Sequence, residues 1–361
     1  MTKRIFNFSA GPAVLPTEVL EKAQAELLSL QGIGMSVMEI SHRSEIFEKI
    51  NHDAQQGIKD LLGLPANYQV LFLQGGATFQ FLMIPLNFLS KETSADYVVT
   101  GTWGEKAVAE AKRCGTAHTI FSTKESGFKS TPIQNELKFN QTAAYVHYTS
   151  NETIEGVEFK YDLDAGKIPL ICDASSNILS KPIDVSKYAM IYAGAQKNLG
   201  PSGVTVVIIR DDLLEKVPEN QFAMLDYKIF AKNNSMLNTP NTWGIYLINL
   251  VCNWIKEKGG LVKMQERNEA KAKVLYDALD ASNFYQAHAD QAARSTMNVT
   301  FRLPSEELEK KFCAAATEIG LDNLKGHRSV GGIRASIYNA FPLAGVEKLV
   351  EFMHDFEQQN G

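Results

Sequence analysis

The chain contains few cysteines, and they are too widely separated to form a zinc or redox motif. Among its 361 residues the four cysteines are Cys114, Cys172, Cys252 and Cys313, and no two form a C-x-x-C arrangement. Scattered cysteines of this kind are typical of free, mostly buried thiols in a reducing cytosol. The sequence therefore predicts neither a disulfide framework nor a metal site.

Long stretches of a single character are also missing. No run approaches about 18 apolar residues, which excludes a membrane-spanning helix. Residues 1–16 lack the apolar core of a signal peptide, so we expect a cytoplasmic protein. There is no basic run, and the formal net charge is -5, which argues against a nucleic-acid partner. With 45% hydrophobic and 21% charged residues, the composition is that of an ordinary globular protein.

Helical and strand-like segments alternate along the chain without internal repeats, which favours an α/β fold with a mostly parallel sheet. Apolar segments predict strands at 68–73, 97–100, 143–148, 168–172, 188–193, 204–209 and 297–303. Periodic segments predict helices at 17–30, 46–62, 79–88, 104–113, 260–279 and 343–356, and one that starts at Thr239-Pro240. We expect a large domain at 16–259, and a smaller α+β domain at 260–361 that includes residues 1–15.

Small residues follow the first predicted strand of the large domain. Gly75, Gly76, Ala77 and Thr78 come directly before a predicted helix. A helix N-terminus offers unpaired N–H groups, and small residues let an anion approach them closely. A tight turn without a ligand is the alternative, and for this motif taken alone it is favoured.

Three larger side chains also follow predicted strands. Trp103 can stack on a flat ring, Asp173 can pair with a protonated ring nitrogen, and Lys197 can act as an amine nucleophile if burial lowers its pKa. Each has an ordinary alternative, namely a core aromatic, an aspartate that caps a turn, and a solvated loop lysine. Because ligands bind at the carboxyl ends of strands in such sheets, the four features in this order point to a phosphorylated pyridine aldehyde.

Five longer strings carry a resemblance that runs nearly the whole length of the chain. They are residues 6–13 (FNFSAGPA), 41–43 (SHR), 151–156 (NETIEG), 192–198 (YAGAQKN) and 325–336 (KGHRSVGGIRAS). With these strings the chain closely resembles the phosphoserine aminotransferase family, whose members are class-V enzymes of fold type I that use pyridoxal 5'-phosphate (PLP). The resemblance implies a large domain with a mostly parallel sheet of the seven-stranded type.

The resemblance also implies how the cofactor is held. Lys197 would carry PLP as a Schiff base and move the substrate proton, and Asp173 would pair with the ring nitrogen. Trp103 would stack on the ring, and Thr153 would contact its hydroxyl. The cofactor phosphate would be held by Ala77, Thr78 and Gln196, together with Asn238 and Thr239 from the other subunit of a homodimer.

Substrate contacts follow from the same resemblance. Arg334 would clamp the α-carboxylate, where a bidentate guanidinium fits best. The substrate phosphate or the side-chain carboxylate of glutamate would be received by His42, Arg43, His327 and Arg328. Ala10 replaces a serine of some family members, so contact there would use the backbone N–H.

The implied reaction transfers the amino group between L-glutamate and 3-phosphohydroxypyruvate in serine biosynthesis, with 4-phosphohydroxythreonine of vitamin B6 biosynthesis as a possible second substrate. Two His-Arg pairs in an acidic chain suit anionic substrates, although they can also be unrelated surface charges. A cysteine desulfurase would need a mobile cysteine at the site, and a glyoxylate-type aminotransferase would not need two His-Arg pairs. A nicotinamide-dependent dehydrogenase would need a G-x-G-x-x-G motif, which is absent. A binding protein without activity would not acquire visible absorption with PLP.

Overall fold

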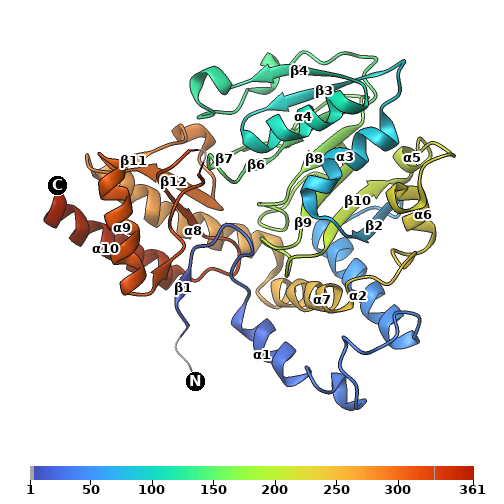
Figure 1. The fold of residues 1–361 in the computed structure, drawn as a ribbon, viewed down its shortest axis with the longest axis horizontal. Coiled ribbons are helices and arrows are strands. Elements are labelled where there is room, and N and C mark those ends of the chain that lie inside the picture. The colour runs from blue at the N-terminus through green and yellow to red at the C-terminus, as the bar shows by residue number, and fades with distance from the viewer. Residues whose placement is uncertain (1–3, 329) are drawn as a thin grey trace.

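The larger part of the protein is built on a seven-stranded sheet (Figure 1). The computed structural model describes residues 4–328 and 330–361, so Ser329 of the 325–336 string lies outside the described residues. The strands run in the order β2-β10-β9-β8-β5-β3-β4. Their bounds are β2 (Tyr68–Leu73), β3 (Ser94–Val99), β4 (Thr116–Ser122), β5 (Val146–Thr149), β8 (Leu170–Asp173), β9 (Met190–Gly194) and β10 (Thr205–Arg210).

The pairing of these strands confirms the predicted α/β fold with a mostly parallel sheet. Strands β4, β3, β5, β8 and β9 pair in parallel, whereas β10 is antiparallel to both β9 and β2. The edge strand β4 was not predicted, because most of its side chains are exposed and it shows little apolar alternation.

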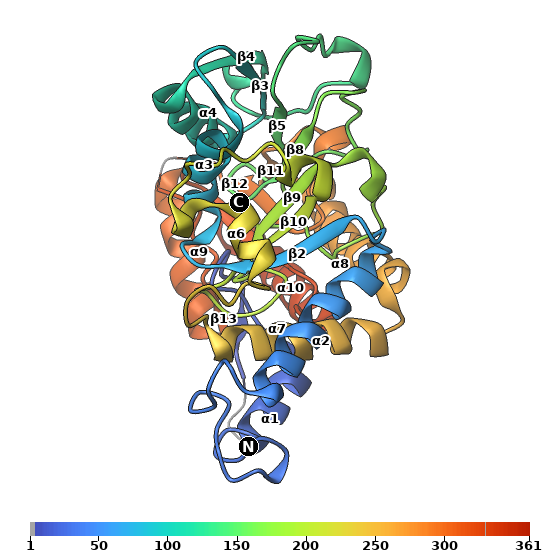
Figure 2. The same ribbon diagram turned by 90° about the vertical axis from the view of Figure 1, so that its right-hand side faces the viewer.

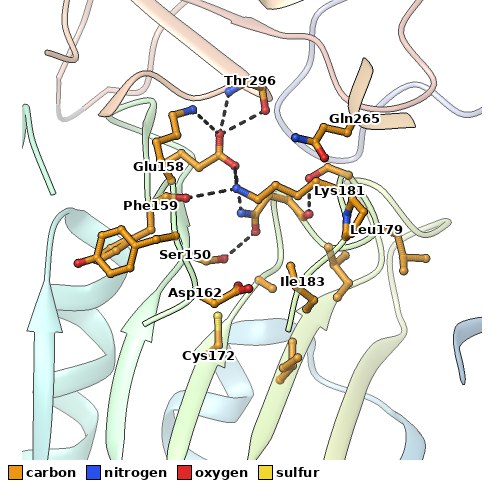
Figure 3. A pocket seen from close by; sticks show the side chains of 18 of the residues that line it. Ser150, Glu158, Phe159, Asp162, Cys172, Leu179, Lys181, Ile183, Gln265 and Thr296 are labelled. Carbon is orange, nitrogen blue, oxygen red and sulfur yellow. Dashed lines mark hydrogen bonds and ion pairs between the residues drawn. The ribbon is translucent and has the colours of Figure 1, made fainter. Parts of the chain in front are cut away.

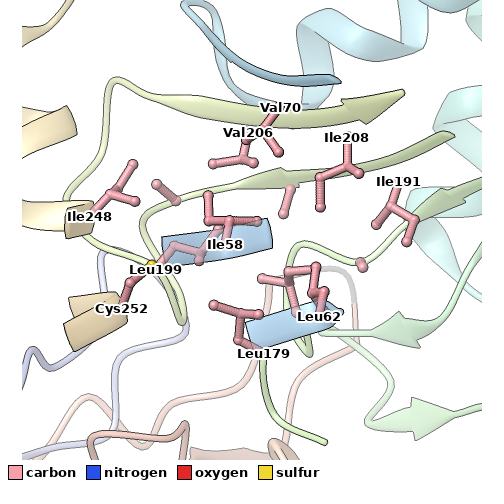
Figure 4. Packing of buried hydrophobic residues seen from close by; sticks show 14 of the residues in the cluster. Ile58, Leu62, Val70, Leu179, Ile191, Leu199, Val206, Ile208, Ile248 and Cys252 are labelled. Atoms are coloured by element: carbon pink, nitrogen blue, oxygen red, sulfur yellow. The ribbon is translucent and has the colours of Figure 1, made fainter. Parts of the chain in front are cut away.

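Both faces of this sheet are covered by helices, as the near-continuous apolar strands require. Val70 and Val206 point to one face, where α2 (Glu45–Leu62) and α7 (Thr242–Glu257) pack (Figure 4). Their neighbours Leu71 and Val207 belong to the cluster on the other face, with α3 (Gly76–Phe88) and α4 (Thr102–Cys114). The short helices α5 (Asp211–Leu214) and α6 (Tyr227–Lys232) follow β10.

A third hydrophobic cluster surrounds a small sheet of order β11-β12-β14. The ribbon of this part is orange to red in Figures 1 and 2. Its elements are β11 (Gln286–Ala287), β12 (Asn298–Arg302), β14 (Ile333–Ser336), α9 (Glu306–Glu318) and α10 (Leu343–Asn360). Phe8 belongs to this cluster, and β1 (Phe6–Asn7) pairs with β13 (Leu321–Asp322). Helix α8 (Gly260–Ala281) joins the two parts, since Met264 packs in the first cluster and Leu275 in the third.

The bounds of two helices differ from those predicted. Helix α1 (Thr17–Ala25) begins at Thr17, as predicted, but ends at Ala25 rather than at residue 30. Helix α7 begins after Asn241 rather than at Thr239-Pro240, because the Asn241 side chain accepts from the N–H of Gly244 at 2.9 Å. In the described part of the chain no helix is long and apolar enough to cross a membrane.

Candidate active site

The loop that carries Lys197 connects two neighbouring strands, β9 and β10. The N–H of Ala195 donates to Val204 O at 2.9 Å, which closes the base of the loop. The half-buried Lys197 donates from Nζ to Thr153 Oγ1 at 2.6 Å, on the segment between β6 (Asn151–Glu152) and β7 (Val157–Glu158). Burial lowers the pKa of the Lys197 amine to about 8, although Asp173 and Glu152 oppose this effect. An amine with a lowered pKa is a usable nucleophile near neutral pH.

Asp173 is the last residue of β8, whereas the sequence predicted that it directly follows the strand. The residue is 4% exposed. One carboxylate oxygen accepts from the N–H of Ser175 at 2.9 Å. Burial raises the pKa of the Asp173 carboxyl, and the nearby Lys197 lowers it. The structure thus places a buried carboxylate and a half-buried lysine at the same edge of the sheet.

The glycine turn before α3 provides open N–H groups at a helix start. Gly75 has φ 91°, and a Cβ there would lie 2.8 Å from Phe79, so this position requires glycine. Helix α3 has no side-chain cap. The half-buried Ala77 and the exposed Thr78 lie on this first turn, whose N–H groups suit an anion.

The N-terminal segment lies against the lysine loop. The N–H of Ala13 donates to Gln196 O at 2.8 Å. A Cβ on Gly11 would lie 3.5 Å from the Lys197 side chain. The hydroxyl of Tyr338 donates to Ala10 O at 2.7 Å. These contacts bring Ala10 and Gln196 to the site.

Several cations gather beside Lys197. Arg334, on β14, is half-buried, and its charge lowers the pKa of Lys197. Burial lowers the pKa of His327, and the charges of Arg334, Lys106 and Arg328 lower it further. The structure therefore brings together the predicted residues Arg334, His327 and Arg328. It also adds Lys106, which was not predicted and lies with Nζ 4.3 Å from the ring centre of Trp103.

Trp103 lies on the first turn of α4, beside the lysine. Its ring centre is 5.8 Å from Lys197 Nζ. The indole Nε1 is buried and has no hydrogen-bond partner within the described residues. This arrangement leaves an aromatic face and a polar edge available to a bound ring.

Four predicted residues are not joined to this group within one chain. Among the described residues, no hydrogen bond or ion pair links His42, Arg43, Asn238 or Thr239 to Lys197 or Asp173. His42 and Arg43 precede α2, and Arg43 is exposed. Thr239 O accepts from Gln74, and Asn238 lines a small space at the ends of β2 and β10.

The cysteines do not support a desulfurase. Cys172 lines a separate cavity of about 390 Å³, which neither Lys197 nor Asp173 lines (Figure 3). Burial raises the pKa of the Cys172 and Cys252 thiols to about 12, and that of Cys313 to about 11. Thiols with raised pKa values are poor nucleophiles.

Comparison with known proteins defines the class to which this fold and site belong. The model of the family "Aminotransferase class-V" matches residues 5–349. The chain therefore belongs to the class-V aminotransferase family.

Three similar proteins are phosphoserine aminotransferases. A phosphoserine aminotransferase from Azotobacter vinelandii is 55% identical over 361 residues, which is 100% of both chains. The solved phosphoserine aminotransferase from Bacillus circulans subsp. alkalophilus has a TM-score of 0.98 and 52% identity, over 99% of each chain. The solved structure of PLP-bound phosphoserine aminotransferase from Trichomonas vaginalis has a TM-score of 0.92 and 42% identity, over 97% of this chain and 100% of that one.

Proposed function

We propose that this protein is a PLP-dependent aminotransferase that exchanges the amino group between L-glutamate and 3-phosphohydroxypyruvate. The products are 2-oxoglutarate and O-phospho-L-serine. One observation carries this proposal, namely that the amine of Lys197, with a pKa lowered to about 8, lies beside buried Asp173 and close to Arg334. The full-length relatives with 52–55% identity support the choice of substrates.

The residues present fit PLP. The uncapped start of α3, with Ala77 and Thr78, suits the phosphate, helped by Gln196. The carboxylate of Asp173 suits a protonated ring nitrogen, Trp103 a ring face, and Thr153 a ring hydroxyl. When bound, PLP supplies an aldehyde for amine exchange and an electron sink for the electrons released at the substrate α-carbon.

Lys197 has two tasks in this proposal. Its neutral amine would hold the cofactor, and the free Nζ would accept the proton from the substrate α-carbon and return it to the bound ligand. Thr153 Oγ1 orients this amine through the hydrogen bond of 2.6 Å. Asp173 holds the ring nitrogen protonated, because a buried carboxylate stabilises a neighbouring positive charge.

Arg334 is proposed to bind the α-carboxylate of every substrate, since a guanidinium binds a carboxylate in a bidentate way. His327 and Arg328 are proposed to bind the phosphate of one substrate and the side-chain carboxylate of the other. Lys106 adds positive charge at the same place. A cluster of cations concentrates doubly anionic substrates at the site.

We further propose a homodimer in which the partner completes each site with its own copies of His42, Arg43, Asn238 and Thr239. Exposed apolar side chains on the chain segment before α2 support this view. Leu28 is 86% exposed and Met38 is 56% exposed, which suits an interface better than solvent. The His42 ring also has a buried Nε2 without a partner in the described chain. The separate hydrophobic cluster around β12 supports residues 260–361, with 1–15, as a smaller domain.

A screen of amino donors and keto acceptors tests the reaction. The protein is incubated with PLP, each donor and each acceptor, and the new amino acid is quantified. We expect L-glutamate with 3-phosphohydroxypyruvate to exceed the same pair with pyruvate or glyoxylate by at least about tenfold, because a lost charged hydrogen bond costs about 1.5–3 kcal/mol. Equal rates with glyoxylate would contradict the proposed substrate.

A further inference from the structure

Two buried carboxylates lie beneath the first turn of α4 and have no part in the proposed reaction. Glu152 and Glu155 belong to the 151–156 string, in which only Thr153 has an expected role. They are 0% and 2% exposed. Within the described residues neither forms an ion pair, although a buried charge without compensation is costly. Their burial therefore needs a physical reason.

Both side chains serve the start of α4. Glu152 accepts with Oε2 from the N–H of Trp103 at 3.0 Å and with Oε1 from the N–H of Gly104 at 2.9 Å. Glu155 accepts with Oε1 from the N–H of Thr102 at 3.0 Å and from the Thr102 hydroxyl at 2.5 Å. The first three N–H groups of the helix are thus satisfied by two carboxylates from another segment.

The neighbouring glycine shows how closely the two carboxylates approach. A Cβ on Gly101 would lie 2.5 Å from Glu152 Cδ and 2.7 Å from Glu155 Oε2. Only glycine leaves room for both side chains at this point. The segment that carries them also carries Thr153, whose hydroxyl accepts from Lys197.

We propose that Glu152 and Glu155 are positioning residues that fix the first turn of α4 against the 151–156 segment. They thereby hold Trp103 and Thr153 in place relative to Lys197. In this arrangement Glu152 is ionised and Glu155 is protonated. This inference rests on the proposed function, in which Trp103 stacks on the cofactor ring. It goes beyond that function by giving the two carboxylates a task and a protonation state.

The hydrogen bonds assign the proton. Both oxygens of Glu152 accept N–H groups at a helix N-terminus, an arrangement that favours the ionised form. Glu155 Oε2 is buried and has no partner in the described chain, and an unpaired O–H costs less there than an unpaired anionic oxygen. Burial raises the pKa of both carboxyls, and the charges of Glu155 and Asp173 raise that of Glu152 further. The pair therefore retains one proton.

Two of the charges around the pair favour this assignment, namely Lys197 near Glu152 and Glu105 near Glu155. The other two, Asp173 near Glu152 and Arg334 near Glu155, oppose it, so the hydrogen bonds decide. An ionised Glu155 would attract the guanidinium of Arg334 and compete with a substrate carboxylate. A neutral Glu155 leaves the positive charge of Arg334 for the substrate.

Two substitutions separate the roles. In Glu152→Gln the amide NH₂ must face a backbone N–H of Trp103 or Gly104, so the first turn loses a hydrogen bond and Trp103 shifts. In Glu155→Gln the amide oxygen still accepts from Thr102, and its NH₂ replaces the proposed O–H. Glu105→Gln is the matched control, since Glu105 lies on the same turn but forms an ion pair with Lys124 at 2.7 Å.

The first measurement is the dissociation constant of PLP, obtained from absorption titrations of each apoprotein whose circular dichroism shows a native fold. We expect Glu152→Gln to weaken PLP binding by at least about tenfold, because one unmatched buried donor costs about 1–3 kcal/mol. Glu155→Gln and Glu105→Gln should stay within about threefold of the wild type. Tight binding by Glu152→Gln, or a large loss in Glu155→Gln, would overturn the proposal.

Infrared spectroscopy of the apoproteins is the second measurement and needs neither PLP nor a folded Glu152 variant. The wild type should show the C=O band of a buried protonated carboxyl group, which disappears in Glu155→Gln and remains in Glu105→Gln. A wild type without this band, or a band that survives in Glu155→Gln, refutes the assignment. If the wild type itself binds no PLP, the proposed function fails instead, so the two failures are distinguishable.

Discussion

Replacement of Glu158 by glutamine tests the electrostatic link between the two parts of the protein. Glu158 lies on β7, and its carboxylate accepts from Lys181 Nζ at 2.9 Å and from the N–H of Thr296, before β12, at 3.0 Å (Figure 3). Lys160 lies 3.2 Å from the same carboxylate. Burial alone would raise the pKa of Glu158, but these two lysines and the Thr296 N–H bring it down to about 2.

The size of the effect follows from this pKa. An ordinary glutamate has a pKa of 4.5, and one pKa unit corresponds to about 1.4 kcal/mol, so the ionised form contributes about 3 kcal/mol to the free energy of unfolding at pH 7. Because the folded pKa lies below the unfolded value, this contribution is complete above pH 4.5 and decreases as the pH falls towards 2. At pH 3 about 1 kcal/mol remains.

The assay is urea unfolding of wild type and Glu158→Gln at pH 7 and at pH 3. We expect the free energy of unfolding of the variant to be about 2–4 kcal/mol lower at pH 7, because removal of the Glu158 charge leaves Lys181 without its buried partner. The difference between the two proteins should shrink by about 2 kcal/mol at pH 3. Glu266→Gln is the control, because the exposed Glu266–Lys263 pair should contribute less than about 1 kcal/mol. A loss that is equal at both pH values would refute the electrostatic explanation.

Three further predictions concern the site. Lys197→Ala should abolish the covalent PLP adduct that borohydride fixes, and in the wild type the rate of adduct formation should rise as the pH passes through about 8, where the amine loses its proton; an adduct in the variant, measured by mass spectrometry, would disprove the assignment. Arg334→Lys should raise KM for every amino-acid substrate at least about tenfold, whereas Arg328→Ala should act mainly on phosphorylated substrates; steady-state kinetics that show equal effects on all substrates would contradict this division. The Lys197→Ala and Arg43→Ala variants, each inactive alone, should together recover about a quarter of the wild-type activity after subunit exchange, because half of the dimers are then hybrids and each hybrid has one intact site. No recovery in a mixture with proven exchange would exclude shared sites.

The central strands could be predicted from sequence because they are buried on both faces. Continuous apolar runs such as 204–209 leave few alternatives to a sheet interior. Edge strand β4, with its exposed side chains, gave no such signal. The start of α7 was misplaced because Thr239-Pro240 has the usual residues of a helix start, whereas the tertiary structure uses Asn241 as the cap.

The chemistry of the site was predictable where a functional residue ends an apolar strand. Asp173 and the glycine turn fall at such places, so their position along the chain carried the information. Lys106 lies on the exposed side of a helix, and its approach to Trp103 depends on a side-chain conformation that no local pattern reveals. The pairing of Glu152 and Glu155 with α4 joins segments about 50 residues apart, and only the fold brings them together.

The single reversed strand of the large sheet has a mechanical consequence. Because β10 returns beside β9, the segment that bears Lys197 is anchored at both ends to neighbouring strands, and Ala195 hydrogen-bonds across its base to Val204. His327 and Arg328, which are proposed to bind the second anionic group of each substrate, instead precede β14 of the small sheet, which has its own hydrophobic cluster. Substitutions around the small sheet can therefore change which acid is accepted while the reactive nitrogen stays in place. In the proposed function, the large sheet holds the reactive amine, and the part around the small sheet binds the group that distinguishes one substrate from another.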